Sequence, residues 1–450
     1  ILIFLLLILF VYLSSQSQSQ SQSILSKSEE IKMNTMIKLI ILRGLVSPHC
    51  FWRDKSDMVL EDKSGVIIYN TIKNRSKEPF IPINVLNLKL YLVMDINYVN
   101  EILQNSPHTF KVGMLKYNFF KSFMKHNLGV STGKNWEHRR IVNENVLYTD
   151  NIHEFSKLHD TYIKNLVYSS DLHTFDDFLL ASKKLTTKMV FNRDQIANEI
   201  FDFLHEVNNV KHFTKKGYKS FGNLEKNYYS YMKENILHPQ KNSLLEIAKR
   251  YENDVTELSH QIPHWVFPIG AAIHSLSMKV LLLLFNHPDK LNIVLNEIKT
   301  YHKDTDWMTL FQLKYLRKCI LESLRLNNNV VSLFRTLNTE YTFDNKYKFP
   351  KGTQFAIFTN PILRSADHFE TPDEFVPERW TPYLEHKHLA SISFSRGPQK
   401  CPGKDMTLFI ATSFVTHFLK KIGTTPVNTN KINNNNISHA INTCKVSFDY

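Results

Sequence analysis

The sequence predicts a mostly α-helical protein with a minor β portion, in which one large domain follows a short N-terminal extension. Helical spacing of apolar residues dominates the 450-residue chain, whereas strand-like runs are few and short. The motifs that carry chemistry extend from residue 136 to residue 419 and have a chemical meaning only together. We therefore expect a single domain, although chain length alone would favour two or three.

The chain begins with 13 uninterrupted apolar residues, ILIFLLLILFVYL (1–13). As a helix they would extend about 20 Å, short of the roughly 30 Å hydrocarbon core of a bilayer. A membrane anchor, the core of a signal peptide and a translation artefact are the three interpretations. Because no basic residues precede the run and no small-residue cleavage pattern follows it, we favour an anchor inserted from one side. This predicts a membrane-associated protein, at an endoplasmic-reticulum-like membrane in a eukaryotic cell.

Residues 14–35 are expected to form a low-complexity linker, because the repeat SSQSQSQSQS has no apolar side chains to bury. Residues 36–450 then form the large domain. A second biased stretch, NTNKINNNN at 428–436, predicts a surface loop.

Helices are predicted where apolar residues recur at intervals of three and four. Five segments show this spacing: 153–168, 193–212, 223–235, 241–260 and 309–326. A sixth segment, 264–285, is almost entirely apolar and ends at Asn286 to Pro288. Its composition resembles that of a membrane helix, but it contains Pro268, two histidines and Lys279, and a buried central helix fits equally well.

Strand signals are limited to VIIYN (66–70), KLYLVM (89–94), TQFAIFT (353–359) and the C-terminal TCKVSFDY. The segment KFPKGTQFAIF predicts a hairpin with Lys351 and Gly352 at its turn.

The chain is basic, with a formal net charge of +13 and a pI of about 9.3. Such a balance favours anionic membranes, acidic protein partners or nucleic acid. The Lys and Arg residues are scattered and accompany no Cys/His finger or aromatic RNA-binding signature, so we expect no nucleic-acid partner. The four cysteines (Cys50, Cys319, Cys401 and Cys444) are far apart and suggest neither a zinc site nor a disulfide scaffold.

One of these cysteines has the surroundings of a metal ligand. Phe394, Gly397, Cys401 and Gly403 follow the spacing F-x-x-G-x-x-x-C-x-G, and an amphipathic helix comes next. Glycines allow the backbone to turn tightly and to approach a flat cofactor closely. Backbone N–H groups of such a loop can bond the sulfur, and the positive end of the following helix favours the thiolate. Taken alone, the motif is better explained by a loop cysteine that precedes a helix. Together with the motifs below, it predicts that Cys401 presents a thiolate to a metal.

Further charged and aromatic residues occur in pairs with helical spacing. Glu322 and Arg325 form E-x-x-R, in which positions i and i+3 share a face and can pair. Trp136 and Arg140 form W-x-x-x-R, again on one face. Each pair alone is a common surface feature.

Taken together and in order, these residues resemble the cytochromes P450, with FVPERW (375–380) similar to the family's P-E-R-F segment. The resemblance implies the family's fold and a haem (iron protoporphyrin IX) whose axial thiolate is Cys401. It implies haem contacts from the loop and from propionate-binding groups, namely Phe394, Gly397, Gly403, Trp136, Arg140 and Arg335. It also implies a structural cluster behind the haem, formed by Glu322, Arg325 and Arg379.

The sequence departs from the family at two places. The residue two before Cys401 is usually Arg or His and here is Gln399, for which Arg396 or Lys400 could compensate. Counting back from Pro288, the family's A-G-x-D/E-T-T falls on 268–273, where this chain reads PIGAAI. The acid and the alcohol that relay protons to dioxygen are therefore replaced by Ala271 and Ala272.

His274 and Ser275 lie one turn further on and are the candidate catalytic residues of a displaced relay, if Pro268 distorts the helix. The alternative for Ser275 is a hydrogen bond to a carbonyl of its own helix.

The resemblance implies a haem-thiolate monooxygenase that oxidises a lipophilic small molecule with O2. Electrons would come from an NADPH-dependent flavoprotein reductase that docks on the basic face around Cys401. Two alternatives stay open because of the altered relay. One is a haem-thiolate isomerase or dehydratase that activates no O2, and the other is a degenerate family member with a non-catalytic role.

Overall fold

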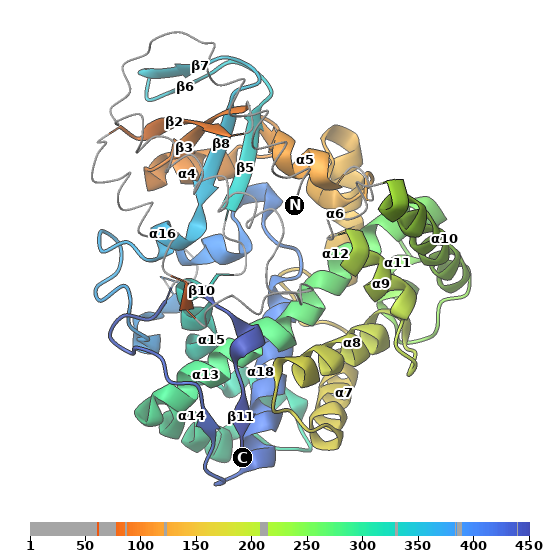
Figure 1. The fold of residues 1–450 in the computed structure, drawn as a ribbon, viewed down its shortest axis with the longest axis vertical. Coiled ribbons are helices and arrows are strands. Elements are labelled where there is room, and N and C mark those ends of the chain that lie inside the picture. The colour runs from red at the N-terminus through yellow and green to blue at the C-terminus, as the bar shows by residue number, and fades with distance from the viewer. Residues whose placement is uncertain are drawn as a thin grey trace.

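The structure is a computed structural model that describes residues 61–62, 78–85, 88–120, 124–207, 215–328, 332–382, 384, 389–438 and 440–450. The expected anchor (1–13), the linker (14–35), Cys50 and the strand expected at 66–70 lie outside the described residues. Helices make up most of the fold and one small sheet forms its upper end in Figure 1, which confirms the predicted fold class.

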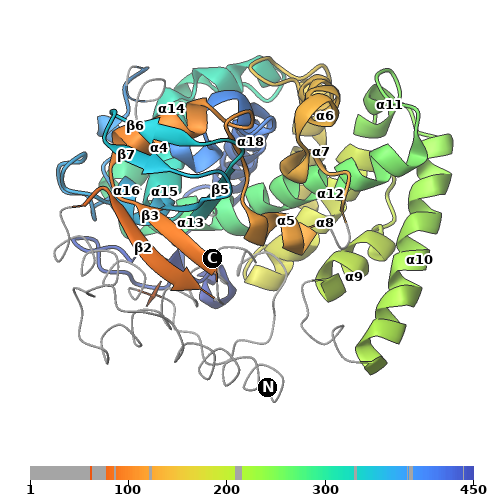
Figure 2. The ribbon, with the colours of Figure 1, turned by 90° about the horizontal axis from the view of Figure 1, so that it is seen from above.

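The principal sheet has five strands in the order β2-β3-β8-β5-β4 (Figure 2). Its members are β2 (Phe80–Val85), β3 (Leu88–Val93), β8 (Gln354–Phe358), β5 (Ser332–Leu337) and β4 (Phe110–Val112). Strand β8 runs parallel to β3 and antiparallel to β5. All five residues of β8 are buried, and the strand lies between two others. The two strands at 89–94 and 353–359 were thus predicted correctly.

The hairpin predicted for KFPKGTQFAIF is wrong. Lys351 and Gly352 do form a turn, with Gly352 at a φ of +89°. The strands on either side of it pair elsewhere: β7 (Tyr347–Phe349) pairs with β6 (Tyr341–Phe343), and β8 pairs with β3 and β5. A buried central strand needs a partner on each edge, and β3 and β5 supply both.

The smaller strand pairs join distant parts of the chain. The C-terminal β11 (Phe448–Asp449) pairs with β9 (Asn428–Thr429), so the loop expected at 428–436 begins in a strand. Strand β1 (Glu61–Asp62) pairs with β10 (Ala440–Ile441).

Most of the longer helices lie below the sheet in Figure 1, whereas α4 and α5 lie at its level. They are α4 (Ile96–Gln104), α5 (Met114–Phe120), α6 (Gly133–Leu147), α7 (Ser156–Ser169), α8 (Phe175–Phe191), α9 (Asn198–Val207), α10 (Lys215–Leu237), α12 (Val255–Ala271), α13 (Met278–Asn286), α14 (Pro288–Tyr301), α15 (Lys314–Leu326) and α18 (Lys404–Ile422). Two short helices, α11 (Leu244–Ala248) and α16 (Thr359–Leu363), connect them.

The helix predicted at 241–260 is in fact two helices. Helix α11 ends at Ala248, and α12 begins at Val255. The cause is Asp254, whose carboxylate accepts the N–H groups of Thr256 and Glu257 and so caps a new helix. The helix predicted at 309–326 likewise divides into a 3₁₀ turn (Trp307–Gln312) and α15.

The central helix is continuous from Val255 to Asn286 and crosses the molecule diagonally in Figure 1. Within the described residues it is the one helix long and apolar enough to cross a membrane, but 83% of its most apolar window is buried inside the fold. Its apolar character is therefore accounted for by its position in the core, as the sequence allowed.

Two prolines interrupt the hydrogen bonds of this helix. Pro263 cannot donate to the Ser259 carbonyl, and the hydroxyl of Tyr228 on α10 donates to that oxygen instead, at 2.5 Å. After Pro268 the helix widens into a π-helical segment, η3 (Ala272–Ser277), where the Ser277 hydroxyl donates to the Ala272 carbonyl at 2.7 Å. Such π segments often occur at functional sites.

Candidate active site

The Cys401 loop is a tight turn that leads into α18. The Cys401 N–H donates to the Phe394 carbonyl at 2.7 Å, and the Gly403 N–H donates to the Cys401 sulfur. Gly397 has a φ of +69°, and a Cβ there would lie 2.3 Å from the Leu103 carbonyl oxygen of α4. The loop therefore requires glycine at position 397, both for its backbone conformation and for its close contact with α4.

Side chains from three neighbouring segments hold this loop in place. Arg140 of α6 donates to the Lys400 carbonyl at 2.5 Å, and Thr149 donates to the Pro402 carbonyl at 2.8 Å. Arg396 donates to the Asn100 side chain of α4 at 2.9 Å. Bonds to the backbone on both sides of Cys401 fix the direction in which its sulfur points.

Burial and the neighbouring groups shift the pKa of the Cys401 thiol in opposite directions. Burial raises the pKa of its thiol, whereas the Gly403 N–H and the charges of Arg140 and Lys116 lower it. Burial has the larger effect, so a free thiol stays protonated at neutral pH. A bound cation would make the thiolate the stable form.

Two further groups lie in electrostatic contact with this site, Lys116 of α5 and His264 of α12. Burial and Arg335 lower the pKa of Lys116 to about 8. Burial, with Lys116 and Arg140, lowers the pKa of His264 to about 4. Lys116, His264 and Cys401 are nevertheless only half-buried. Lys116 affects the pKa of both His264 and Cys401, so the three side chains lie close together.

Two of the three cations near Cys401 have no carboxylate partner in the described part of the chain. Arg140 bonds Glu144 of its own helix at 2.7 Å. Among the described residues, however, no carboxylate forms an ion pair with Lys116 or Arg335. Burial lowers the pKa of Arg335 to about 10, and its guanidinium donates to the Ser106 hydroxyl and the Phe334 carbonyl. Desolvated cations without a carboxylate partner are costly, so the site is suited to an anionic ligand.

Trp136 lies on α6 one turn from Arg140, and both side chains are buried. The Trp136 ring packs edge-on against His108, with ring centroids 6.1 Å apart. The structure thus gathers Arg140, Arg335 and the Cys401 loop, which the sequence had singled out, in one region.

The three residues of the expected structural cluster meet around one carboxylate. Glu322 accepts hydrogen bonds from Arg325 through both oxygens, and from Arg379 at 3.1 Å. It also accepts the Trp380 indole N–H at 2.9 Å and the Val376 N–H at 3.1 Å. Arg325 in turn donates to the carbonyls of Leu363 and Pro372, and it has no accessible surface. This E-x-x-R is a buried network, not a surface pair.

The residues of the proposed displaced relay, His274 and Ser275, are fully buried within η3. The His274 ring contacts Ser182 of α8 at 3.1 Å and packs edge-on against Phe175, and burial lowers the pKa of His274 to about 3. Ser275 has no accessible surface within η3. His274 thus contacts α8, and its role in a proton relay stays a prediction.

One face of α12 borders the group formed by Lys116, His264 and Cys401. Its half-buried positions are His264, Phe267, Pro268 and Ala271, and the positions between them are buried. This i, i+3, i+4, i+7 spacing is one helical face. Ala272, the expected alcohol position, is fully buried. The sequence signal that could have identified His264 is its position four residues before Pro268. No sequence pattern identified Lys116.

A family model described as Cytochrome P450 matches residues 274–447. Sesterfisheric acid synthase of Neosartorya fischeri is 32% identical over 134 residues, which are 28% of this chain and 24% of that protein. 7,8-Epoxymelianol synthase of Ailanthus altissima is 31% identical over 150 residues, which are 32% of this chain and 30% of that protein. The matched region thus spans less than a third of each of these relatives.

Two solved structures share the fold over most of the chain. Retinoic acid-bound cyanobacterial CYP120A1 has a TM-score of 0.67 and 16% identity, and the match covers 82% of this chain and 91% of that chain. P450BioI, in complex with an acyl carrier protein ligated to hexadec-9Z-enoic acid, has a TM-score of 0.63 and 14% identity, with 82% and 94% covered. Residues 274–447 thus match the cytochrome P450 family in sequence, and most of the chain shares the fold of two solved P450 structures.

Proposed function

We propose that this protein is a haem-thiolate monooxygenase that oxidises a lipophilic small molecule with O2 and electrons from an NADPH-dependent flavoprotein reductase. The observation that carries the proposal is the presentation of Cys401 from a loop fixed by α4 and α6, beside Lys116 and Arg335, which have no carboxylate partner in the described part of the chain.

The residues of this site fit a haem. Cys401 would ligate the iron, and Arg140, Arg335 and Lys116 would hold the two propionates. Pairing with propionates would relieve the desolvation that lowers the pKa of Lys116 and Arg335. The Gly403 N–H donor would moderate the electron donation of the thiolate. When bound, a haem with a thiolate ligand supplies O–O cleavage chemistry.

The α12 face beside the site offers few groups that could supply protons. The α12 face beside the site carries His264, Phe267, Pro268 and Ala271, with no carboxylate or hydroxyl among them. His264 is the titratable group there, and its pKa of about 4 keeps it neutral at pH 7. A neutral imidazole can orient a water or accept a proton, but it is a weak acid. We therefore propose a poorly coupled monooxygenase.

A second candidate function is a haem-thiolate isomerase or dehydratase, which the missing acid–alcohol pair favours. Such an enzyme needs no reductase because its substrate brings its own oxygen. A degenerate, non-catalytic protein would keep the fold without turnover. The relatives named as synthases do not separate these possibilities, because each match spans less than a third of the relative.

Membrane association and the reductase belong to the same proposal. The apolar residues 1–13 would anchor the chain at an endoplasmic-reticulum-like membrane, and the basic residues near Cys401, such as Arg396 and Lys400, would face an acidic reductase surface. Partition of the full chain with membranes, and its release when residues 1–23 are removed, would support this part.

The test measures product formation from candidate lipophilic substrates, with O2, NADPH and reductase together and with O2 or the reductase left out. Product that requires O2, NADPH and reductase together supports the monooxygenase. Product formed from an oxygenated substrate without O2 or reductase supports the isomerase or dehydratase. A purified chain that binds no haem would contradict both and leave the non-catalytic role.

A further inference from the structure

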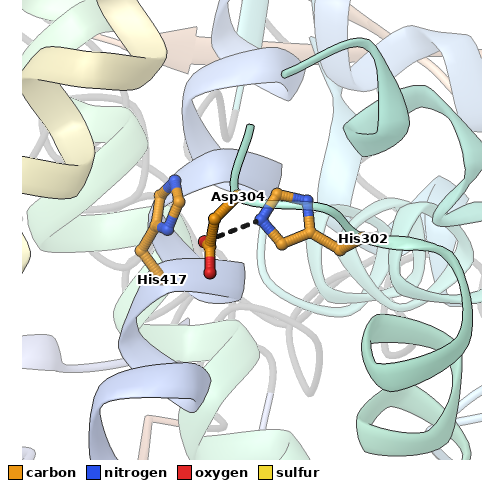
Figure 3. Close-up of side chains that lie close together, drawn as sticks. All are labelled: His302, Asp304 and His417. Atoms are coloured by element: carbon orange, nitrogen blue, oxygen red, sulfur yellow. Dashed lines mark ion pairs between the residues drawn. The ribbon is translucent and has the colours of Figure 1, made fainter. Parts of the chain in front are cut away.

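Away from Cys401, two histidines and an aspartate converge at the far end of α18. His302 directly follows α14, Asp304 lies two residues later, and His417 lies within α18. One potential ligand atom of each residue lies within 4.8 Å of the other two (Figure 3). His417 is thirteen residues beyond the start of α18, which places it about 20 Å along the helix axis from the Cys401 loop.

Hydrogen bonds fix the tautomer of His302. Its Nδ1 lies 3.1 Å from the Thr309 hydroxyl oxygen. That hydroxyl donates its one hydrogen to the Asp306 carbonyl at 2.6 Å, so it can only accept from the histidine. Nδ1 of His302 therefore carries the proton, and Nε2 presents a lone pair. Nε2 is buried and has no hydrogen-bond partner, and it lies 3.6 Å from Oδ1 of Asp304.

The same reasoning applies to His417. Its Nε2 lies 2.9 Å from Oδ1 of Asp160 on α7. The same oxygen of Asp160 accepts the Ser413 hydroxyl at 2.6 Å, and a carboxylate at neutral pH only accepts hydrogen bonds. Nε2 of His417 is then the donor, and Nδ1 presents a lone pair. Nδ1 is buried and also has no hydrogen-bond partner.

Each imidazole is thus oriented from behind by an acceptor and leaves its other nitrogen open, which is the usual arrangement of metal-binding histidines. The carboxylate of Asp304 supplies a third lone-pair donor. We propose that His302, Asp304 and His417 form a zinc(II) site with two imidazole nitrogens, one carboxylate oxygen and a water. Borderline-soft zinc prefers this mixture of ligands in tetrahedral geometry.

The site is open to solvent on one side only. Both histidine side chains are 1% exposed, whereas Asp304 is 46% exposed, so zinc would enter past the aspartate. Ligand atoms around tetrahedral zinc lie about 3.3 Å apart. Asp304, on an exposed segment, is the group that can move to close the site.

Two lysines compete with the metal. Lys420 bonds Oδ2 of Asp304 at 2.6 Å, and Lys164 lies 3.6 Å from Oδ1. Lys420 can stay on Oδ2 while Oδ1 binds zinc, but Lys164 must withdraw. The positive charges of the two lysines limit the affinity of the site for zinc to a moderate value. Bound zinc would link the end of α14 to α18 and, through Asp160, to α7.

The test measures zinc bound by the full-length protein as purified, after dialysis against zinc-buffered solutions, using elemental analysis and zinc K-edge X-ray absorption. We expect one zinc per chain with nitrogen and oxygen ligands and no sulfur. Asp304→Asn, an exposed change that should leave the fold intact, and His417→Gln should lose this zinc. Asp160→Asn should weaken binding about 10- to 100-fold.

His138, an exposed histidine that pairs with Glu252, provides the matched control. His138→Ala should keep the full zinc content. Equal zinc content in the wild type and in both ligand variants, absence of zinc from the wild type at every concentration, or sulfur in the ligand shell would each overturn the proposal. Spectra of the haem do not enter this measurement, so its result is independent of the proposed function.

Discussion

The carboxylate of Glu322 accepts hydrogen bonds from the Arg325 guanidinium through both oxygens, at 2.9 Å and 2.8 Å, and neither side chain has accessible surface. Two buried charges are stable only when each is fully compensated. Arg379, Trp380 and backbone groups supply the remaining hydrogen bonds, so α15 and the segment around residue 379 are connected through this one carboxylate.

Replacing Glu322 with Ala should lower the free energy of unfolding by about 3–5 kcal/mol, because Arg325 would be left as an uncompensated buried charge. Haem retention should fall with it. Urea denaturation and the haem absorbance of the purified variant measure the two effects. The control is Glu340→Ala, which removes a pair with Lys348 whose side chains are more than half exposed and which should cost at most about 1 kcal/mol. Equal effects of the two substitutions would show that the network contributes little.

Gly397→Ala should prevent stable formation of the Cys401 loop. The new Cβ would combine a positive φ with a position 2.3 Å from the Leu103 oxygen. Gly352→Ala is the matched control, since Gly352 also has a positive φ but no atom within 4 Å of a new Cβ. It should show only the backbone strain, about 1–2 kcal/mol. We expect haem content to fall in the Gly397 variant alone, and normal haem content in both would contradict the close contact with α4.

Lys116→Met should stabilise the haem-free protein at pH 7 and weaken haem binding. In the wild type the pKa of Lys116 falls from 10.5 in the unfolded chain to about 8 in the folded one. Between these pH values the unfolded state binds more protons, so stability should rise as pH increases from about 8 to 10.5. This increment should be missing from Lys116→Met. Denaturation of both haem-free proteins across this pH range, with haem titrations at pH 7, tests the prediction. Identical pH dependence would show that Lys116 is not desolvated.

Ala271→Thr should improve coupling, because Ala271 lies on the α12 face that carries His264. Ala272→Thr should instead cost about 1–3 kcal/mol of stability through overpacking, since Ala272 is fully buried. This differs from the assignment of the hydroxyl to position 272 by counting along the sequence. The ratio of peroxide formed to NADPH consumed, with a reductase present, measures coupling. Better coupling in the Ala272 variant would instead place the hydroxyl at position 272, as counting along the sequence predicted.

His274→Leu should leave this peroxide ratio unchanged, because the His274 ring contacts Ser182 and Phe175 of α8. His264→Leu should change it, since His264 is the titratable group on the face beside Lys116 and Arg140. A loss of coupling confined to His274→Leu or Ser275→Ala would instead support the displaced relay that the sequence suggested.

The sequence predicted the parts of the site that depend on short spacings. The glycines around Cys401 and the i, i+3 spacing of Glu322 and Arg325 are local patterns with a definite geometry. Lys116 and His264 reach the same region from α5 and α12, and only the tertiary fold brings them together. The helix boundary at Asp254 and the partners of β8 were mispredicted for a related reason. The Asp254 cap begins a new helix inside a stretch whose apolar spacing predicted one continuous helix. The partners of β8 depend on the burial of that strand and not on the turn at Gly352.

The central claim is that Cys401 supplies the thiolate ligand of a haem. The reduced, carbon monoxide-bound absorption spectrum of the purified protein tests it most directly. The wild type should show the thiolate-type band, Cys401→Ala should lose it, and Cys50→Ala, Cys319→Ala and Cys444→Ala should keep it. A thiolate-type band that persists in Cys401→Ala, or that disappears in one of the other three variants, would contradict the assignment.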